Sequence, residues 1–242
     1  GDSQSNVGKN LMTLANTYNQ IWLKNYETIN GEYANWNGLD QYNRNPYWDL
    51  SKNQNKSDKD VFRFTAKAIY NIDKNLKIQG TIGTDINDMN FQDYIARTTP
   101  GKSAGQLQES VFKNRTLNAE ILALYNNQFG SFDVNATLGG NIFRVDNKTT
   151  IFTGLGEQMP GVIAIMNYQE QSVQQNTYKK QINSIYGSAS IGYDHTYYLE
   201  GTVRGDKSST LPTSNNTYIY PSVSASWVFS EYLKNKNIIN YG

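Results

Sequence analysis

The sequence contains no cysteine, which excludes a disulfide framework and any thiolate-ligated metal site. Its single histidine, His195, lies in a short polar turn without an evident partner, so the sequence does not indicate a nucleophilic triad. The formal net charge of +1 offers no basic surface for nucleic acid. No apolar run approaches the length of a transmembrane helix, although barrel strands would escape that test because they alternate. We therefore expect no enzyme, no metal and no cofactor.

Tyrosine and glycine are abundant instead, at 18 and 19 residues, together with many Asn and Thr residues. This mixture favours twisted β-structure with long polar loops over a helical bundle. Period-two alternation of apolar and polar residues then locates the strands. We predict strands at 61–72, 76–87, 116–125, 132–142, 182–193, 197–206 and 218–229.

Alternation also assigns the two faces of each strand, because successive side chains point to opposite sides. In 132–142, Val134, Ala136 and Leu138 alternate with Asn135 and Thr137. In 197–206, the apolar set contains Leu199 and Val203, and the polar set contains Glu200, Arg204 and Asp206. The tripeptide Arg-Gly-Asp at 204–206 therefore belongs to a strand, and we do not interpret it as an integrin-type motif.

Connections between these strands alternate between short and long. Tight turns are predicted at 73–75, 130–131 and 194–196, and long loops at 88–115, 145–180 and 207–217. Aromatic residues gather near the tight turns, as they do at a lipid–water interface. Outer-membrane barrels have this asymmetry of loops. A soluble β-sandwich also alternates apolar and polar residues, so the pattern alone leaves both architectures open.

Residues 1–60 are polar and carry no clean strand. Apolar residues at three- and four-residue spacing predict one amphipathic helix, formed by Leu11, Leu14, Ala15, Tyr18, Ile21, Trp22 and Tyr26. The rest of this segment, from 31 to 60, is rich in Asn, Tyr, Trp and Asp and is typical of a loop.

Four motifs resemble one known family. "YYLEGTVRGDKSS" and the later "YIYPSVSASWVFSE" are similar to a strand end followed by an aromatic-Pro-Ser-x-Ser strand in SusC/RagA-type TonB-dependent outer-membrane transporters of the Bacteroidetes. "NPYW" at 45–48 and "YNNQFGSFDVNATLGGN" at 125–141 are also similar. The carriers in the first two motifs are Arg204, Asp206, Ser208, Ser209, Tyr220, Pro221, Ser222, Ser224 and Trp227.

The resemblance implies an all-β fold in which antiparallel up-and-down strands form part of a large outer-membrane β-barrel. Residues 1–60 would be an extracellular loop and helical segment. Residues 61–242 would be a partial transmembrane barrel of about seven strands, incomplete at the C-terminus, whereas the family's barrels have about 22 strands and a plugged lumen. The whole protein would import oligosaccharides or peptides. Its partners would be a SusD-like surface lipoprotein, TonB and outer-membrane lipid.

Candidate functional residues follow from both arguments. Glu200, Arg204 and Asp206 are expected to face the barrel lumen, whereas Leu138, Leu199 and Val203 are expected to face lipid. Long loops are often functional, so Tyr94, Arg97, Tyr168 and the Gln/Asn-rich stretch 169–176 either contact a ligand or pack against one another. Sequence reasoning assigns no substrate-binding residue. The alternative function is a soluble, secreted glycan-binding β-sandwich module.

Overall fold

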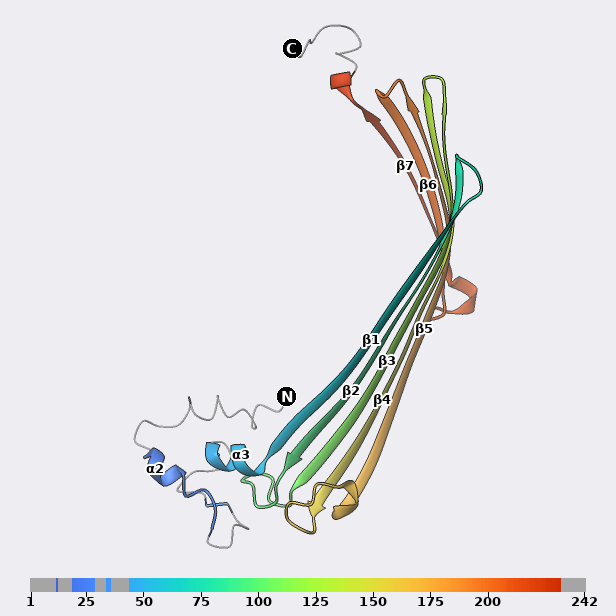
Figure 1. The fold of residues 1–242 in the computed structure, drawn as a ribbon. Helices are drawn as coiled ribbons and strands as arrows, with labels where there is room; N and C mark the ends of the chain where they lie inside the picture. Colours follow the sequence, from blue (N-terminus) through green and yellow to red (C-terminus); the bar gives the residue numbers. More distant parts are fainter. Residues whose placement is uncertain (1–11, 13–18, 29–33, 36–43, 232–242) are drawn as a thin grey trace. The chain divides into compact units, whose positions relative to one another are not determined.

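The computed structural model describes residue 12 and residues 19–28, 34–35 and 44–231. Seven strands hydrogen-bond in sequence order to form one antiparallel up-and-down sheet (Figure 1). They are β1 (Gln54–Asn71), β2 (Leu76–Ile95), β3 (Gln106–Phe129), β4 (Phe132–Glu157), β5 (Tyr168–Tyr193), β6 (Tyr197–Ser208) and β7 (Thr217–Trp227). This confirms the predicted all-β fold. No helix in the described ranges combines the length and apolar character needed to cross a membrane.

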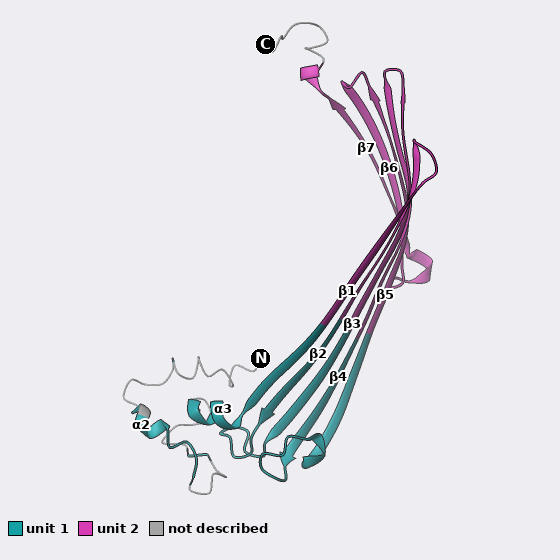
Figure 2. Ribbon diagram, in the orientation of Figure 1, with its two compact units in different colours: residues 1–60, 87–113, 148–177 teal, residues 61–86, 114–147, 178–242 magenta. Residues whose placement is uncertain are grey.

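The chain divides into two compact units (Figure 2). Unit 1 comprises residues 1–60, 87–113 and 148–177, and unit 2 comprises residues 61–86, 114–147 and 178–242. Unit 1 holds the short helices α2 (Gln20–Leu23) and α3 (Pro46–Lys52), and unit 2 holds the tight turns together with β6 and β7. The predicted division at residue 60 concerns placement in a membrane and stays a prediction.

Two predicted long loops are wrong, because most of their residues are strand. β2 continues to Ile95 and β3 begins at Gln106, so the 88–115 loop shrinks to residues 96–105. β4 and β5 likewise reduce the 145–180 loop to residues 158–167, which include a 3-10 turn at Ile165–Asn167. These strand segments lack apolar alternation, and the sequence pattern therefore hid them. Pairing of backbone groups with neighbouring strands needs no apolar face.

Residues 31–60 were also predicted to be a loop, and this is wrong for two parts of the segment. β1 begins at Gln54, although its first residues include the charged run from Lys56 to Asp60. Helix α3 starts where the Asn45 side chain accepts a hydrogen bond from the Tyr47 N–H at 3.0 Å, with Pro46 at the first helical turn. Both features are standard helix-start signals.

The predicted N-terminal amphipathic helix is only partly tested. Among the described residues, α2 covers Gln20–Leu23, and Asn19 Oδ1 accepts from the Ile21 N–H at 2.8 Å. Tyr26 lies outside the helix, which corrects the prediction: its carbonyl accepts from the Asn35 N–H, next to a bridge between Glu27 and Ala34. Leu11, Leu14, Ala15 and Tyr18 lie outside the described residues.

The three tight turns are as predicted, and an up-and-down order places them at the same end of their strands. Asp194 and His195 both have φ of 52°, and the Thr196 N–H bonds to the Tyr193 carbonyl at 3.0 Å. Positive φ at both central residues is the type I′ geometry that suits the twist of a hairpin. The Asp194 N–H also bonds to the Ser131 carbonyl at 2.9 Å, which joins two neighbouring turns.

Strand β5 is longer than its neighbour β6. The pairing of the two begins at Ile182 with Ser208 and ends at Tyr193 with Tyr197. Just beyond it, the Ser209 N–H bonds to the Gln181 carbonyl at 2.9 Å, and the chain then leaves through residues 209–216 to β7. Residues 168–180 of β5 therefore extend past the end of β6.

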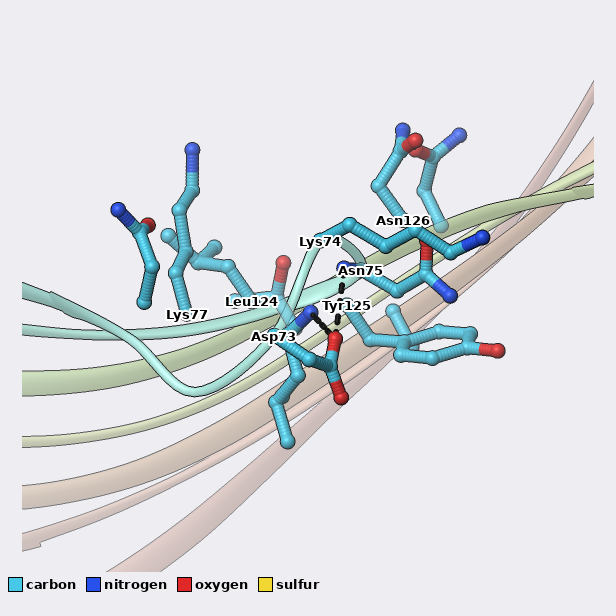
Figure 3. Close-up of a pocket in the computed structure, with 12 residues that line it drawn as sticks. Asp73, Lys74, Asn75, Lys77, Leu124, Tyr125 and Asn126 are labelled. Atoms are coloured by element: carbon cyan, nitrogen blue, oxygen red, sulfur yellow. Dashed lines mark hydrogen bonds between the residues drawn. The ribbon is translucent and has the colours of Figure 1, made fainter.

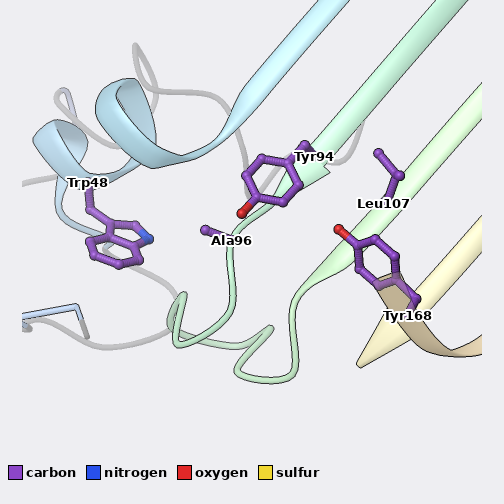
Figure 4. Packing of buried hydrophobic residues seen from close by; sticks show 5 residues of the cluster. All are labelled: Trp48, Tyr94, Ala96, Leu107 and Tyr168. Carbon is purple, nitrogen blue, oxygen red and sulfur yellow. The ribbon is translucent and has the colours of Figure 1, made fainter. Parts of the chain in front are cut away.

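Apolar residues are distributed very differently in the two units. Every hydrophobic side chain found buried among the described residues belongs to unit 1, where Trp48, Tyr94, Ala96, Leu107 and Tyr168 form one cluster (Figure 4). In unit 2, Leu138 is 61 % exposed and Val223 is 79 % exposed. Unit 1 thus has a small core of its own, whereas apolar side chains of unit 2 such as these two remain exposed.

Candidate functional site

One face of the sheet in unit 2 is polar across its last three strands. Residues opposite each other in antiparallel strands share a face. Ser184 lies opposite Asp206, which lies opposite Tyr218, and Tyr186, Arg204 and Tyr220 form the next row. Ser190, Glu200 and Ser224 form a third row on the same face. The three predicted site residues, Glu200, Arg204 and Asp206, thus share one face, as their alternation requires.

The opposite face of these strands is apolar. Ile191, Leu199 and Ala225 lie in one row, and Ile185, Gly205 and Ile219 lie in another. Leu199 is 56 % exposed, and Leu138 lies on this face because its Cδ1 reaches to 3.9 Å from where a Gly187 Cβ would stand. The sheet therefore separates polar from apolar side chains, as the alternation predicts. Which face meets a lumen and which meets lipid stays a prediction.

Arg204 organises the polar face. Its Nε donates to both carboxylate oxygens of Asp206, at 2.9 and 3.1 Å, and its Nη2 donates to the Ser184 hydroxyl at 3.1 Å. The guanidinium also lies 5.3 Å from the centre of the Tyr186 ring, within range of a cation–π interaction. The Tyr186 hydroxyl in turn donates to Glu120 on β3. One chain of polar contacts therefore links β3, β5 and β6.

A glycine makes room for the Tyr186 ring. A Cβ on Gly139 of β4 would overlap the ring carbons of Tyr186 and lie 2.8 Å from a methyl of Leu122. The same relation recurs at Gly192, where a Cβ would lie 2.7 Å from the Tyr198 ring. Because real Cβ atoms do not approach that closely, a side chain at Gly139 or Gly192 would force the tyrosine ring to move.

A second polar constellation lies in unit 1, at the end of β4. The buried carboxylate of Glu157 accepts three hydrogen bonds: from the Tyr94 hydroxyl at 2.8 Å, the Arg97 N–H at 3.0 Å and the Gly161 N–H at 2.8 Å. These donors come from β2 and from the two connections 96–105 and 158–167. Burial, and then the hydrogen bond to Glu157, raise the pKa of Tyr94 well above its usual range.

Next to Glu157 is a cavity of about 420 Å³. Side chains from α3, from the end of β2 and from the 96–105 and 158–167 connections line it, including Trp48, Lys52, Tyr94, Arg97, Pro160 and Ile163. Its volume falls within the range of small-molecule pockets. Among the residues that the sequence singled out in the long loops, Tyr94 and Arg97 line this cavity.

The predictions for Tyr94, Tyr168 and residues 169–176 have different outcomes. Tyr168 is 1 % exposed and Tyr94 is 3 % exposed, so both side chains mainly pack in the core of unit 1 (Figure 4). Residues 169–176 are exposed, but they belong to β5 and not to a loop. Sequence reasoning missed Glu157, Glu120 and Tyr186, because each acts through partners far away in the chain. The only local signal is Gly156, whose φ of 78° marks a backbone bend before Glu157.

A further cavity of about 440 Å³ lies beside the first tight turn of unit 2 (Figure 3). Asp73 Oδ1 accepts from the N–H groups of Asn75 and Leu76, at 2.7 and 2.9 Å, and so fixes the turn. The remaining lining is contributed mainly by Lys77, Tyr125, Asn126 and Asn135. With Asp73 occupied by the turn itself, this cavity has the character of a solvated surface recess.

Two polar residues noted in the sequence, His195 and Asp85, each lie next to a side chain from another strand. His195 is exposed, and its Nδ1 lies 3.1 Å from Asp133 Oδ2, a partner that the sequence did not reveal. Asp85 pairs with Arg63. Across the described ranges, no three His, Cys, Asp or Glu side chains gather as metal ligands would.

No protein-family model matches the chain, and no curated protein matches it either. Solved structures do. The "RagAB peptide transporter" matches with a TM-score of 0.73 and 16 % identity over 82 % of this chain. The RagAB peptide importer in its "closed-closed" state matches with a TM-score of 0.73 and 16 % identity over 88 %. In its "open-open" state, it matches with a TM-score of 0.70 and 16 % identity over 76 %.

The matched region is 22 %, 24 % and 21 % of those structures' chains, respectively. Similarity at this level of identity concerns the fold, and it does not transfer an activity. The chain is therefore similar in fold to one part of a chain in the RagAB peptide transporter, and that part is between a fifth and a quarter of the chain's length.

Proposed function

We propose that this chain forms part of the barrel wall of a TonB-dependent outer-membrane importer of nutrients such as oligosaccharides or peptides. The observation that carries the proposal is the two-faced sheet of unit 2, with a polar network on one side and exposed aliphatic side chains on the other. A sheet of that kind is stable when lipid covers the apolar face and the polar face lines an aqueous lumen. The similarity in fold to the RagAB transporter gives separate support.

The rival function, a soluble glycan-binding β-sandwich, is less well supported. A sandwich needs a second sheet to bury the apolar face of the first. All seven strands in the described residues belong to a single sheet, and Leu138, Val203 and Val223 remain more than half exposed. Lipid provides the missing cover without a second sheet.

Further parts of the proposal come from the resemblance in sequence. The tight turns would lie on the periplasmic side, and the 96–105 and 158–167 connections on the extracellular side. Glu200, Arg204 and Asp206 would face the lumen. A SusD-like lipoprotein would bind outside the cell, and TonB would supply energy through other parts of the importer. The RagAB structures are described as peptide transporters, which makes peptides one candidate cargo here.

Two neighbouring substitutions on β4 test the membrane placement. Leu138 belongs to the apolar face and Thr137 to the polar one. An arginine on the lipid side near the bilayer centre costs about 2–4 kcal/mol. We expect Leu138→Arg in the full-length protein to reduce the folded, heat-modifiable form in outer-membrane fractions severely, whereas Thr137→Arg leaves most of it.

The two variants carry the same new charge at adjacent positions, so each is the control of the other. Equal amounts of folded protein in the outer membrane for both variants would refute the lipid-facing assignment. Recovery of the wild-type protein in the soluble fraction would favour the sandwich.

A further inference from the structure

We propose that the cavity lined by Trp48, Lys52, Arg97 and Ile163 in unit 1 is a binding pocket for a carboxylate-bearing ligand, with the Arg97 guanidinium as its anchor. The proposal rests on the proposed function, because it assigns part of the importer's cargo recognition to this pocket. It goes further by naming the site and the chemical group that it takes.

The walls of the pocket are held in place before any ligand arrives. The Trp48 indole N–H donates to the Thr99 hydroxyl at 2.8 Å, and the Thr99 hydroxyl donates to the Ala96 carbonyl at 2.6 Å. Asn53 Oδ1 accepts from the Ala96 N–H at 2.9 Å, which ties the end of α3 to the end of β2. Asn167 similarly holds the 158–167 connection through the Met159 and Val162 carbonyls. Such preorganisation lowers the entropic cost of binding.

Two cationic side chains, Lys52 and Arg97, line the pocket beside the carboxylate of Glu157. Glu157 keeps its negative charge, because its three hydrogen-bond donors are neutral, but they occupy three of its about four acceptor positions. Lys52 lies across the pocket, 6.0 Å from the centre of the Trp48 ring, and pairs with Glu27 at 2.5 Å. Of the two cations, Arg97 is the one for which no ion pair is found among the described residues.

The guanidinium of Arg97 is lightly engaged. Within the described part of the chain, its Nη1 donates a hydrogen bond to the Gln158 carbonyl at 3.5 Å, and this contact is exposed. A guanidinium carries five N–H donors in a planar fork that matches the two oxygens of a carboxylate. The backbone N–H of the same residue is fixed on Glu157, which holds the base of the side chain in the pocket wall.

Two kinds of cargo carry such a carboxylate: a peptide with a free C-terminus and an oligosaccharide with a uronic acid. The pocket volume of about 420 Å³ admits a few residues of either one. The shared chemistry is the carboxylate, and the binding assay decides between its sources.

The test is calorimetric titration of the purified full-length protein in detergent with two matched pairs of ligands. Trialanine is compared with its C-terminal amide, and a glucuronic-acid disaccharide with its neutral glucose counterpart. We expect the acid of one pair to bind at least about tenfold more tightly than its neutral analogue. Arg97→Gln should remove that preference, and Arg97→Lys should keep part of it, since a point charge lacks the fork.

Lys59→Gln is the control, because it removes one positive charge from an exposed position of β1 in the same unit. It should leave both titrations unchanged. A melting curve for each variant shows that the protein is folded. The proposal is overturned if neither acid is preferred, or if Arg97→Gln binds as the wild type does. This failure would leave the proposed function standing, since outer-membrane insertion of the Leu138→Arg and Thr137→Arg pair is measured without any ligand.

Discussion

At the scale of single residues, Tyr94 and Tyr168 share one buried cluster but differ at their hydroxyls. The Tyr94 hydroxyl donates to Glu157 at 2.8 Å. The Tyr168 hydroxyl is buried and has no hydrogen-bond partner among the described residues. Removing one partner of a buried hydrogen bond costs about 1–3 kcal/mol, whereas removing an unsatisfied hydroxyl costs little or stabilises.

We therefore expect Tyr94→Phe to lower the free energy of unfolding of unit 1 by about 1–3 kcal/mol. Tyr168→Phe should leave it unchanged or raise it slightly. Protection of the backbone amides of 94–107 against hydrogen exchange is the measurement, because it reports on unit 1 alone. Equal loss of protection in the two variants would show that the Glu157 hydrogen bond is not what distinguishes them.

Individual contacts such as these were beyond prediction from the sequence. The Tyr186 hydroxyl meets Glu120 across 66 positions of the chain, and Tyr94 meets Glu157 across 63. Alternation states which face a side chain takes, and it placed Arg204 and Asp206 correctly on one face. It does not state which residue of a neighbouring strand lies opposite, because that depends on register.

At the scale of elements, Gly139 and Tyr186 fit β4 to β5. We expect Gly139→Ala to destabilise the sheet by about 1–3 kcal/mol, because the new methyl would displace the Tyr186 ring. Gly201→Ala is the matched control, since nothing lies within 4 Å of a Cβ built there. Urea unfolding of the full-length protein in detergent compares the two. A Gly139→Ala midpoint equal to that of Gly201→Ala would mean that the ring moves aside freely.

The elements that the sequence predicted well are those with one apolar and one polar face. The 132–142 and 197–206 strands fall inside β4 and β6, and the tight turns lie where they were predicted, at 73–75, 130–131 and 194–196. The parts of β2, β3, β4 and β5 that lie mainly in unit 1 were missed, because they lack a regular alternation of apolar and polar residues. Helix α3 was missed although Asn45 and Pro46 signal its start, since a helix of seven residues carries too little periodicity.

At the scale of the whole molecule, the sheet has two open edges among the described residues. β1 and β7 stand first and last in the strand order. Unpaired edge groups are untenable in hydrocarbon and promote association in water. We expect the 242-residue chain, purified without detergent, to be polydisperse by light scattering. A monodisperse monomer that melts cooperatively would contradict this and would indicate a closed soluble β-fold.

Strand β5 also has an unpaired edge, from Tyr168 to Lys180, because β5 extends past the end of β6 along this stretch. Along this stretch every second N–H points toward β4, and the N–H groups between them point away from it. Amide exchange should consequently be slow and fast at alternating positions, a zigzag along a single strand. A binding partner that adds a strand there would slow the fast set alone. That change would reveal the partner's position without any structure of the complex.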